Sequence, residues 1–265
     1  MSGPRTLAID IGGTGVKAAL LDEAGHLLGE RHRVPTPPKP VKPDDLLQAI
    51  DRVVAPIGEF DRVSVGFPGY VRDGKVRTAP NLGTEVLGGF DLQEALARRW
   101  HKPVRVLNDA DVQGFGAIKG KGIEMVLTLG TGAGTSLFRD GELMPHLELA
   151  HHPIRGRKTY DEWVGNAALQ KKGKKAWNKR VEEVIDVLRT VVCFDHLYIG
   201  GGNAKAIKFQ LPPDVTTVPN TDGLTGGFGL WRMSERSDDG AEEASAPPPP
   251  PAEEAGEGAQ AALPS

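Results

Sequence analysis

The sequence predicts a two-lobed α/β protein with a cleft between its lobes. Strand-like and helix-like segments alternate along the chain, which is typical of an α/β layered fold. A glycine-rich hairpin pattern occurs twice, 118 positions apart, and this duplication favours two lobes of similar construction that face each other. Of the 265 residues, 39% are hydrophobic and 25% are charged, so the chain can build the cores of one or two globular domains.

The first hairpin is predicted from residues 5–22, where a buried strand at 5–11 and a returning strand at 16–22 are joined by three glycines. The second hairpin repeats this order, with strands at 126–129 and 135–138 on either side of another three glycines. A purely structural hairpin needs one or two glycines, so both turns have more than a turn requires.

The other elements continue the alternation. The first lobe is predicted to contain an extended proline-rich connection at 35–43, helices at 46–55 and 92–100, and strands at 63–67 and 104–107. The second lobe is predicted to contain a helix whose apolar face runs from Trp177 to Leu188, a strand at 197–199 that leads into three glycines, and a last ordered piece at 223–231.

Charge and composition divide the chain into three parts. We place the N-terminal lobe at 1–108 and the C-terminal lobe at 109–233. Residues 234–265 have eight acidic side chains, one arginine and five consecutive prolines, and lack the apolar content that offsets ordering entropy. We predict a disordered acidic, proline-rich tail; the alternative is a proline-rich ligand for a partner's aromatic groove.

The lone cysteine and the hydropathy pattern exclude several classes of protein. Cys193 is the only cysteine, so neither an internal disulfide nor a cysteine-based zinc site is possible, and its apolar neighbours predict that it is buried. No apolar run is long enough for a membrane-spanning helix, and the first residues do not resemble a secretion signal. We expect a cytoplasmic protein.

Three glycine clusters are candidate phosphate sites. In residues 10–17 (DIGGTGVK), backbone N–H groups at Gly12 and Gly13, the Thr14 hydroxyl and the Lys17 amine can bind phosphate oxygens, and Asp10 can hold a hydrated Mg²⁺. Residues 130–134 and 200–202 are the second and third candidates. An ordinary glycine-rich hairpin without a ligand is the alternative for each of them.

Two polar clusters are candidates for chemistry on a sugar. Asp109 follows a predicted strand, where it could cap a helix or act as a general base toward a hydroxyl group that attacks a phosphoryl group. Glu148 and His151, three positions apart, can bind neighbouring sugar hydroxyls. His151 and His152 could suggest a metal, but no further cysteine or histidine follows nearby, which disfavours zinc.

Together these motifs resemble the ROK family (repressor, open reading frame, kinase), within the wider actin/hexokinase/Hsp70-like (ribonuclease H-like) fold. The resemblance covers residues 5–233 and is greatest to the polyphosphate glucokinase (polyphosphate/ATP-glucomannokinase) branch. The segments that carry it are 10–17 (DIGGTGVK), 36–40 (TPPKP), 108–114 (NDADVQG), 128–134 (TLGTGAG) and 148–151 (ELAH).

This resemblance implies a kinase that transfers a phosphoryl group from polyphosphate or ATP to the 6-hydroxyl of glucose, with Mg²⁺, without zinc and as a homodimer. Asp109 would be the catalytic base. The implied sugar-binding residues are Asn81, Asn108, Glu148, His151 and the backbone of Gly69. Donor phosphates would bind Gly12, Gly13, Thr14, Lys17, Thr131, Gly132 and Gly134, with Asp10 at the metal and Gly201 and Gly202 at a nucleotide.

The chain departs from the family pattern in three places. The cysteine-rich zinc segment is absent, which fits the zinc-free branch, and Ala150 replaces a family glycine. The family's second sugar-binding glutamate has no clear equivalent, because Asp161 and Glu162 are near its place but out of register.

Donor choice and the class of protein stay open at this point. Residues 155–180 contain nine basic and two acidic side chains, and Lys171, Lys175 and Lys179 are either a solvated helix face or a track for polyphosphate. A non-catalytic, sugar-binding regulator of the same family is the alternative function. Only residues 1–4 precede the first predicted strand, which leaves no room for a DNA-binding helix-turn-helix there.

Overall fold

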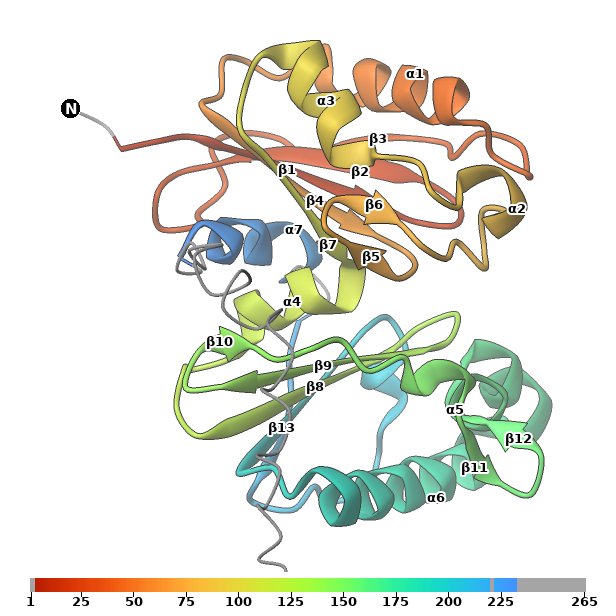
Figure 1. Cartoon of the computed structure of the whole chain (residues 1–265). Helices are drawn as coiled ribbons and strands as arrows, with labels where there is room; N and C mark the ends of the chain where they lie inside the picture. Colours follow the sequence, from red (N-terminus) through yellow and green to blue (C-terminus); the bar gives the residue numbers. More distant parts are fainter. Residues whose placement is uncertain (1–2, 220–221, 233–265) are drawn as a thin grey trace, which may run out of the picture. The chain divides into compact units, whose positions relative to one another are not determined.

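The structure is a computed structural model that describes residues 3–219 and 222–232. In this part of the chain, two five-stranded sheets are the main elements, and helices cover their faces (Figure 1). The tail predicted at 234–265 lies outside the described residues, so its disorder stays a prediction.

The first sheet has the strand order β3-β2-β1-β4-β7. Its strands are β1 (Thr6–Ile11), β2 (Val16–Leu21), β3 (His32–Val34), β4 (Arg62–Phe67) and β7 (Val104–Asn108). β2 is antiparallel to β1 and to β3, whereas β4 is parallel to β1 and to β7. β1 and β4 are buried along nearly their whole length, as expected for central strands covered on both faces.

The second sheet has the order β10-β9-β8-β13-β14 and the same strand directions. Its strands are β8 (Ile123–Leu129), β9 (Ala133–Arg139), β10 (Glu142–Leu143), β13 (His196–Gly200) and β14 (Val215–Thr217). Each glycine hairpin therefore belongs to a five-stranded sheet, and the two sheets have the same topology, as the predicted duplication requires.

Helices enclose a separate core on each sheet. α1 (Pro43–Val54) and α3 (Leu92–Trp100) cover the first sheet, and α6 (Asn166–Val192) covers the second (Figure 1). α1 begins with a proline at its first position and packs five apolar residues into the core. α4 (Asp109–Ala117) contacts β4 and β7 of the first sheet and β8 and β9 of the second, so it lies between the two sheets.

Short elements complete the described chain. They are β5 (Val71–Arg72), β6 (Lys75–Val76), α2 (Thr84–Leu87), η1 (Leu149–His151), β11 (Pro153–Arg155), β12 (Lys158–Thr159), α5 (Tyr160–Val164), η2 (Ala204–Ala206), α7 (Asp222–Thr225) and η3 (Gly226–Trp231). α7 and η3 contact α4 and the first sheet, and Leu224 packs with Ala8, Ala19 and Leu21. The last ordered piece therefore returns to the first sheet.

Two local predictions are wrong. Cys193 is exposed, because it follows α6 in the left-handed conformation (φ 55°) and this turn directs its side chain away from the core. The second is the common helix face of Lys171, Lys175 and Lys179. The predicted apolar face from Trp177 to Leu188 is confirmed as part of α6, but this helix is broken at Gly173 (φ 73°, ψ 162°). Lys171 and Lys175 therefore do not share one continuous helix face.

Among the described residues, we find no helix that combines the length and apolar character needed to cross a membrane.

Candidate active site

One cavity of about 410 Å³ brings together every residue predicted for the site. Its wall includes the end of β1, the start of α4, both glycine hairpins and the end of β13. The predicted residues that line it are Asp10, Gly12, Gly13, Thr14, Lys17, Gly69, Asn81, Asn108, Asp109, Thr131, Gly132, Gly134, Glu148, His151, Gly201 and Gly202. The structure thus gathers these residues at one place; the role of each stays a prediction.

The first hairpin presents an ion pair to this cavity. Asp10 and Lys17 face each other across β1 and β2, and the Lys17 Nζ donates to Asp10 Oδ2 at 2.8 Å. The turn is closed by a bond from Gly12 N to the Gly15 carbonyl at 2.9 Å. The amine is held close to the glycine backbone, where it can neutralise an anion that binds there.

The proline-rich segment packs along the same hairpin and adds a residue that the sequence analysis missed. Thr36 Oγ1 donates to the Gly12 carbonyl at 2.6 Å, and Arg33 Nη2 donates to the Thr14 carbonyl at 3.1 Å. These bonds anchor the segment so that Lys39 reaches the cavity wall. A lysine between two prolines, inside a motif shared with a kinase family, is the signal that could have identified it.

The second hairpin is shaped by Asp161 of α5. Asp161 Oδ1 accepts from Ala133 N at 2.7 Å, and a Cβ on Gly132 would lie 2.3 Å from that oxygen, so only glycine fits there. Glu162 instead completes a capping box with Thr159 at the start of α5. The cavity wall therefore contains Asp161 and not Glu162, a choice that the sequence left open.

Asn108 and Asp109 lie where β7 ends and α4 begins. Asn108 is the N-cap: its Oδ1 accepts from Ala110 N at 2.8 Å, and its Nδ2 donates to the Gly69 carbonyl at 3.0 Å. The capping role considered for Asp109 thus belongs to Asn108. Burial, followed by the negative charges of Asp10, Asp111 and Glu148, raises the pKa of Asp109 to about 7.

Glu148 directly precedes η1, His151 is its last residue, and both line the cavity. The Glu148 side chain is 38% exposed, and an ion pair with His146 at 3.5 Å lowers the pKa of its carboxyl. His151 and Asn81 are exposed. Hydrogen-bond donors and acceptors therefore both line the space next to Asp109, as the binding of several hydroxyls requires.

Comparisons with known proteins agree with this geometry. The model of the ROK family matches residues 6–147, more than half of the chain. The polyphosphate glucokinase of Mycobacterium leprae is 30% identical over 237 residues, which cover 84% of this chain and 73% of that protein.

The chain belongs to the ROK family.

Solved structures of ROK proteins show the same fold. The inorganic polyphosphate/ATP-glucomannokinase from Arthrobacter sp. strain KM superposes with a TM-score of 0.77 at 29% identity, covering 87% of this chain and all of that one. A ROK family transcriptional regulator, a homologue of the Escherichia coli MLC protein, gives a TM-score of 0.64 at 14% identity over 85% of this chain and 77% of its own. The predicted actin/hexokinase-like fold is confirmed, and the relatives support a kinase with a sugar acceptor.

The charges of the ROK cavity bear on which cation could bind. Its wall holds four carboxylates (Asp10, Asp109, Glu148 and Asp161) but only two amines (Lys17 and Lys39). Residues 3–219 and 222–232 contain no group of three or more His, Cys, Asp or Glu side chains placed to hold a metal ion. This donor set fits Mg²⁺ that would be carried mainly by donor phosphates and water, and the role of Asp10 as its protein partner stays a prediction.

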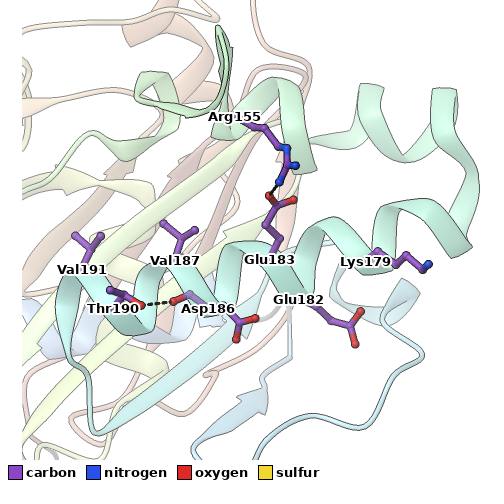
Figure 2. Close-up of a pocket in the computed structure, with 8 residues that line it drawn as sticks. All are labelled: Arg155, Lys179, Glu182, Glu183, Asp186, Val187, Thr190 and Val191. Atoms are coloured by element: carbon purple, nitrogen blue, oxygen red, sulfur yellow. Dashed lines mark hydrogen bonds and ion pairs between the residues drawn. The ribbon is translucent and has the colours of Figure 1, made fainter.

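A second hollow, of about 630 Å³, lies on α6 and contains no predicted site residue (Figure 2). Three carboxylates line it, from Glu182, Glu183 and Asp186, and Glu183 pairs with Arg155. Lys179 is at its rim with its amine pointing outward (Figure 2). These carboxylates disfavour a polyanion at this surface of the ROK protein.

Proposed function

We propose that this ROK protein is a Mg²⁺-dependent hexose kinase of the glucokinase type, which transfers the terminal phosphoryl group of polyphosphate or ATP to the 6-hydroxyl of glucose. The observation that carries the proposal is that one cavity contains both glycine hairpins and Asp109. Burial raises the pKa of the Asp109 carboxyl to about 7. Relatives named polyphosphate glucokinase and polyphosphate/ATP-glucomannokinase support this choice of acceptor and donors.

In the proposed reaction, Asp109 accepts the proton of the 6-hydroxyl while that oxygen attacks the terminal phosphorus. The bond from phosphorus to the bridging oxygen breaks, and the shortened donor leaves. Asn81, Glu148, His151 and the Gly69 backbone bind the other sugar hydroxyls, and Asn108 holds the loop of Gly69 against α4. Asp161, which the cavity also includes, is a further candidate for a sugar hydroxyl.

The donor phosphates would bind between the two hairpins, at Gly12, Gly13, Thr14 and Lys17 on one side and at Thr131, Gly132 and Gly134 on the other. Gly201 and Gly202 also line the cavity and would contact a nucleoside when a nucleotide is the donor. Carboxylates outnumber amines in this cavity, so a polyanion requires an accompanying cation. When bound near Asp10, Mg²⁺ would offset the charge on the donor phosphates.

The deciding experiment is a coupled assay for glucose 6-phosphate, run with ATP and with long-chain polyphosphate, and repeated with mannose. We expect Asp109→Asn to lower kcat about 10³-fold with either donor, because the general base is lost. Asp45→Asn, which changes an exposed carboxylate in the first turn of α1, is the matched control and should retain full activity.

The same assay tests the alternative. If hexoses raise the melting temperature but no product forms with either donor, the result favours a sugar-binding regulator. The solved ROK transcriptional regulator has the same fold as this chain. The cytoplasmic location and the homodimer stay predictions, and light scattering after gel filtration measures the number of subunits.

A further inference from the structure

A buried histidine outside the predicted site connects the site to α4. The His146 side chain is 10% exposed and lies in the segment between β10 and η1. Its Nδ1 is 3.2 Å from Asp111 Oδ2, and its Nε2 is 3.5 Å from Glu148 Oε2. One imidazole ring thus lies between a carboxylate of α4 and a carboxylate of the cavity wall.

The surroundings of His146 fix its position. The ring stacks on Tyr70, with centroids 5.4 Å apart and planes at 17°. Thr135 Oγ1 donates to the Leu147 carbonyl at 3.0 Å, and Met144 N donates to the Leu137 carbonyl at 2.8 Å, so β9 holds the segment on both sides of the ring. A rotation of the imidazole away from its two carboxylates would break its stacking on Tyr70.

The two carboxylates determine the charge of the ring. A neutral imidazole has one N–H and can donate to one carboxylate only, whereas the imidazolium donates from both nitrogens. The ionisable groups that face the ring are Asp111 from α4, Glu148 from its own segment and Tyr70 from the connection between β4 and β5. Asp111 and Glu148 outweigh the effect of burial and raise the pKa of His146 to about 10.

Asp111, the α4 partner of His146, is itself a buried carboxyl group. Its side chain is 5% exposed, and its Oδ1 has no hydrogen-bond partner among the residues that the structure describes. Burial raises the pKa of Asp111, and the hydrogen bond and positive charge of His146 oppose this rise by stabilising the ionised carboxylate. Asp111 is two residues after Asp109 in α4, and its negative charge contributes to the raised pKa of the proposed base.

We propose that His146 is a positioning residue, which as a cation bridges Asp111 and Glu148 and thereby holds the ionised Glu148 carboxylate at the sugar side of the cavity. The inference rests on the proposed function, since it assigns Glu148 to the sugar. It predicts that His146 acts on the acceptor and not on the donor.

Steady-state kinetics test this division. We expect His146→Asn to raise the KM for glucose about tenfold, because the ion pair with Glu148 is lost, and to leave the KM for ATP within about twofold of the wild type. His152→Asn, the same change at an exposed histidine outside the cavity, is the control and should alter neither constant. An unchanged glucose KM, or equal rises in both constants, overturns the proposal.

A double-mutant cycle separates positioning from general loss of stability. If His146 acts through Glu148, adding His146→Asn to Glu148→Gln should change the glucose KM by less than about twofold. Additive effects of the two changes overturn the proposal, because they show that His146 acts independently of Glu148.

A spectroscopic readout does not depend on activity. In the wild-type protein, NMR of labelled imidazole nitrogens should show His146 as an imidazolium at pH 8, and Asp111→Asn should move its titration to lower pH. A neutral His146 ring at pH 8 overturns the proposal. If the wild type phosphorylates no hexose, the proposed function fails, and this measurement still decides whether the cationic bridge exists.

Discussion

At the scale of single residues, the titration of Asp109 governs when the proposed base can act. Only its ionised form accepts a proton, and burial raises its pKa to about 7. We therefore expect kcat/KM to rise about tenfold per pH unit below pH 7 and to level off above it. A pH–rate profile from pH 5 to 9 with saturating Mg²⁺ measures this. A profile that is flat between pH 5 and 7 would contradict the assignment of Asp109.

Single residues also show where sequence-based prediction succeeds and where it fails. Asp10, Asp109 and the hairpin glycines could be found because each belongs to a short motif with a local chemical meaning. Asp161 could not be separated from Glu162, because the choice depends on the approach of α5 to the backbone of Gly132. His146 gave no signal, since its meaning comes from Asp111, 35 positions away.

At the scale of elements, the proline-rich segment connects β3 to α1 and places Lys39 at the cavity. We expect Lys39→Ala to raise the KM for polyphosphate about tenfold, because one of two amines facing the donor is lost, and to leave the KM for glucose unchanged. Lys42→Ala, a change in the same segment but outside the cavity, is the control. A larger effect on glucose than on polyphosphate would place Lys39 on the acceptor side.

The broken helix α6 decides between two interpretations of its lysines. Gly173 separates Lys171 from Lys175, and Lys179 lies at the rim of a hollow that is lined by three carboxylates (Figure 2). We expect the triple change of Lys171, Lys175 and Lys179 to Glu to leave the ratio of polyphosphate to ATP activity within about twofold of wild type, as a solvated face requires. A selective loss of polyphosphate activity would instead support the interpretation of these lysines as a polyphosphate track.

Elements were predictable to the extent that their pattern is local. Both hairpins, α1, α3 and the central strands follow from hydrophobic periodicity and glycine placement, and the structure confirms them. The segment predicted at 223–231 corresponds to α7 and η3, but where it packs was not predictable. It contacts the first sheet through residues more than a hundred positions earlier. No local pattern encodes such a return.

At the scale of the whole molecule, η3 packs the end of the described chain against the first sheet. Trp231 Nε1 donates to Ser64 Oγ at 2.8 Å, and the guanidinium groups of Arg62 and Arg105 lie 5.2 and 4.7 Å from its ring. We expect Trp231→Ala to lower the free energy of unfolding by about 2–3 kcal/mol, because this packing is lost.

Trp231→Phe is the matched variant for that measurement. It keeps an aromatic ring near Arg62 and Arg105 and removes only the N–H, so we expect a loss of about 1 kcal/mol in urea denaturation. Equal losses for the two variants would show that the hydrogen bond to Ser64, rather than the ring, holds this segment.

The duplicated sheets make the two rims of the cavity equivalent in topology but unequal in chemistry. Asp10 pairs with Lys17 across the first hairpin, whereas Thr128 pairs with Gly134 at the corresponding register of the second, so an ion pair on one rim is matched by a single hydroxyl on the other. This broken symmetry gives the cavity a polarity. A linear phosphate chain bound in the proposed way would meet the Asp10–Lys17 ion pair on one side only, and could be bound in one direction even though its repeating units are identical.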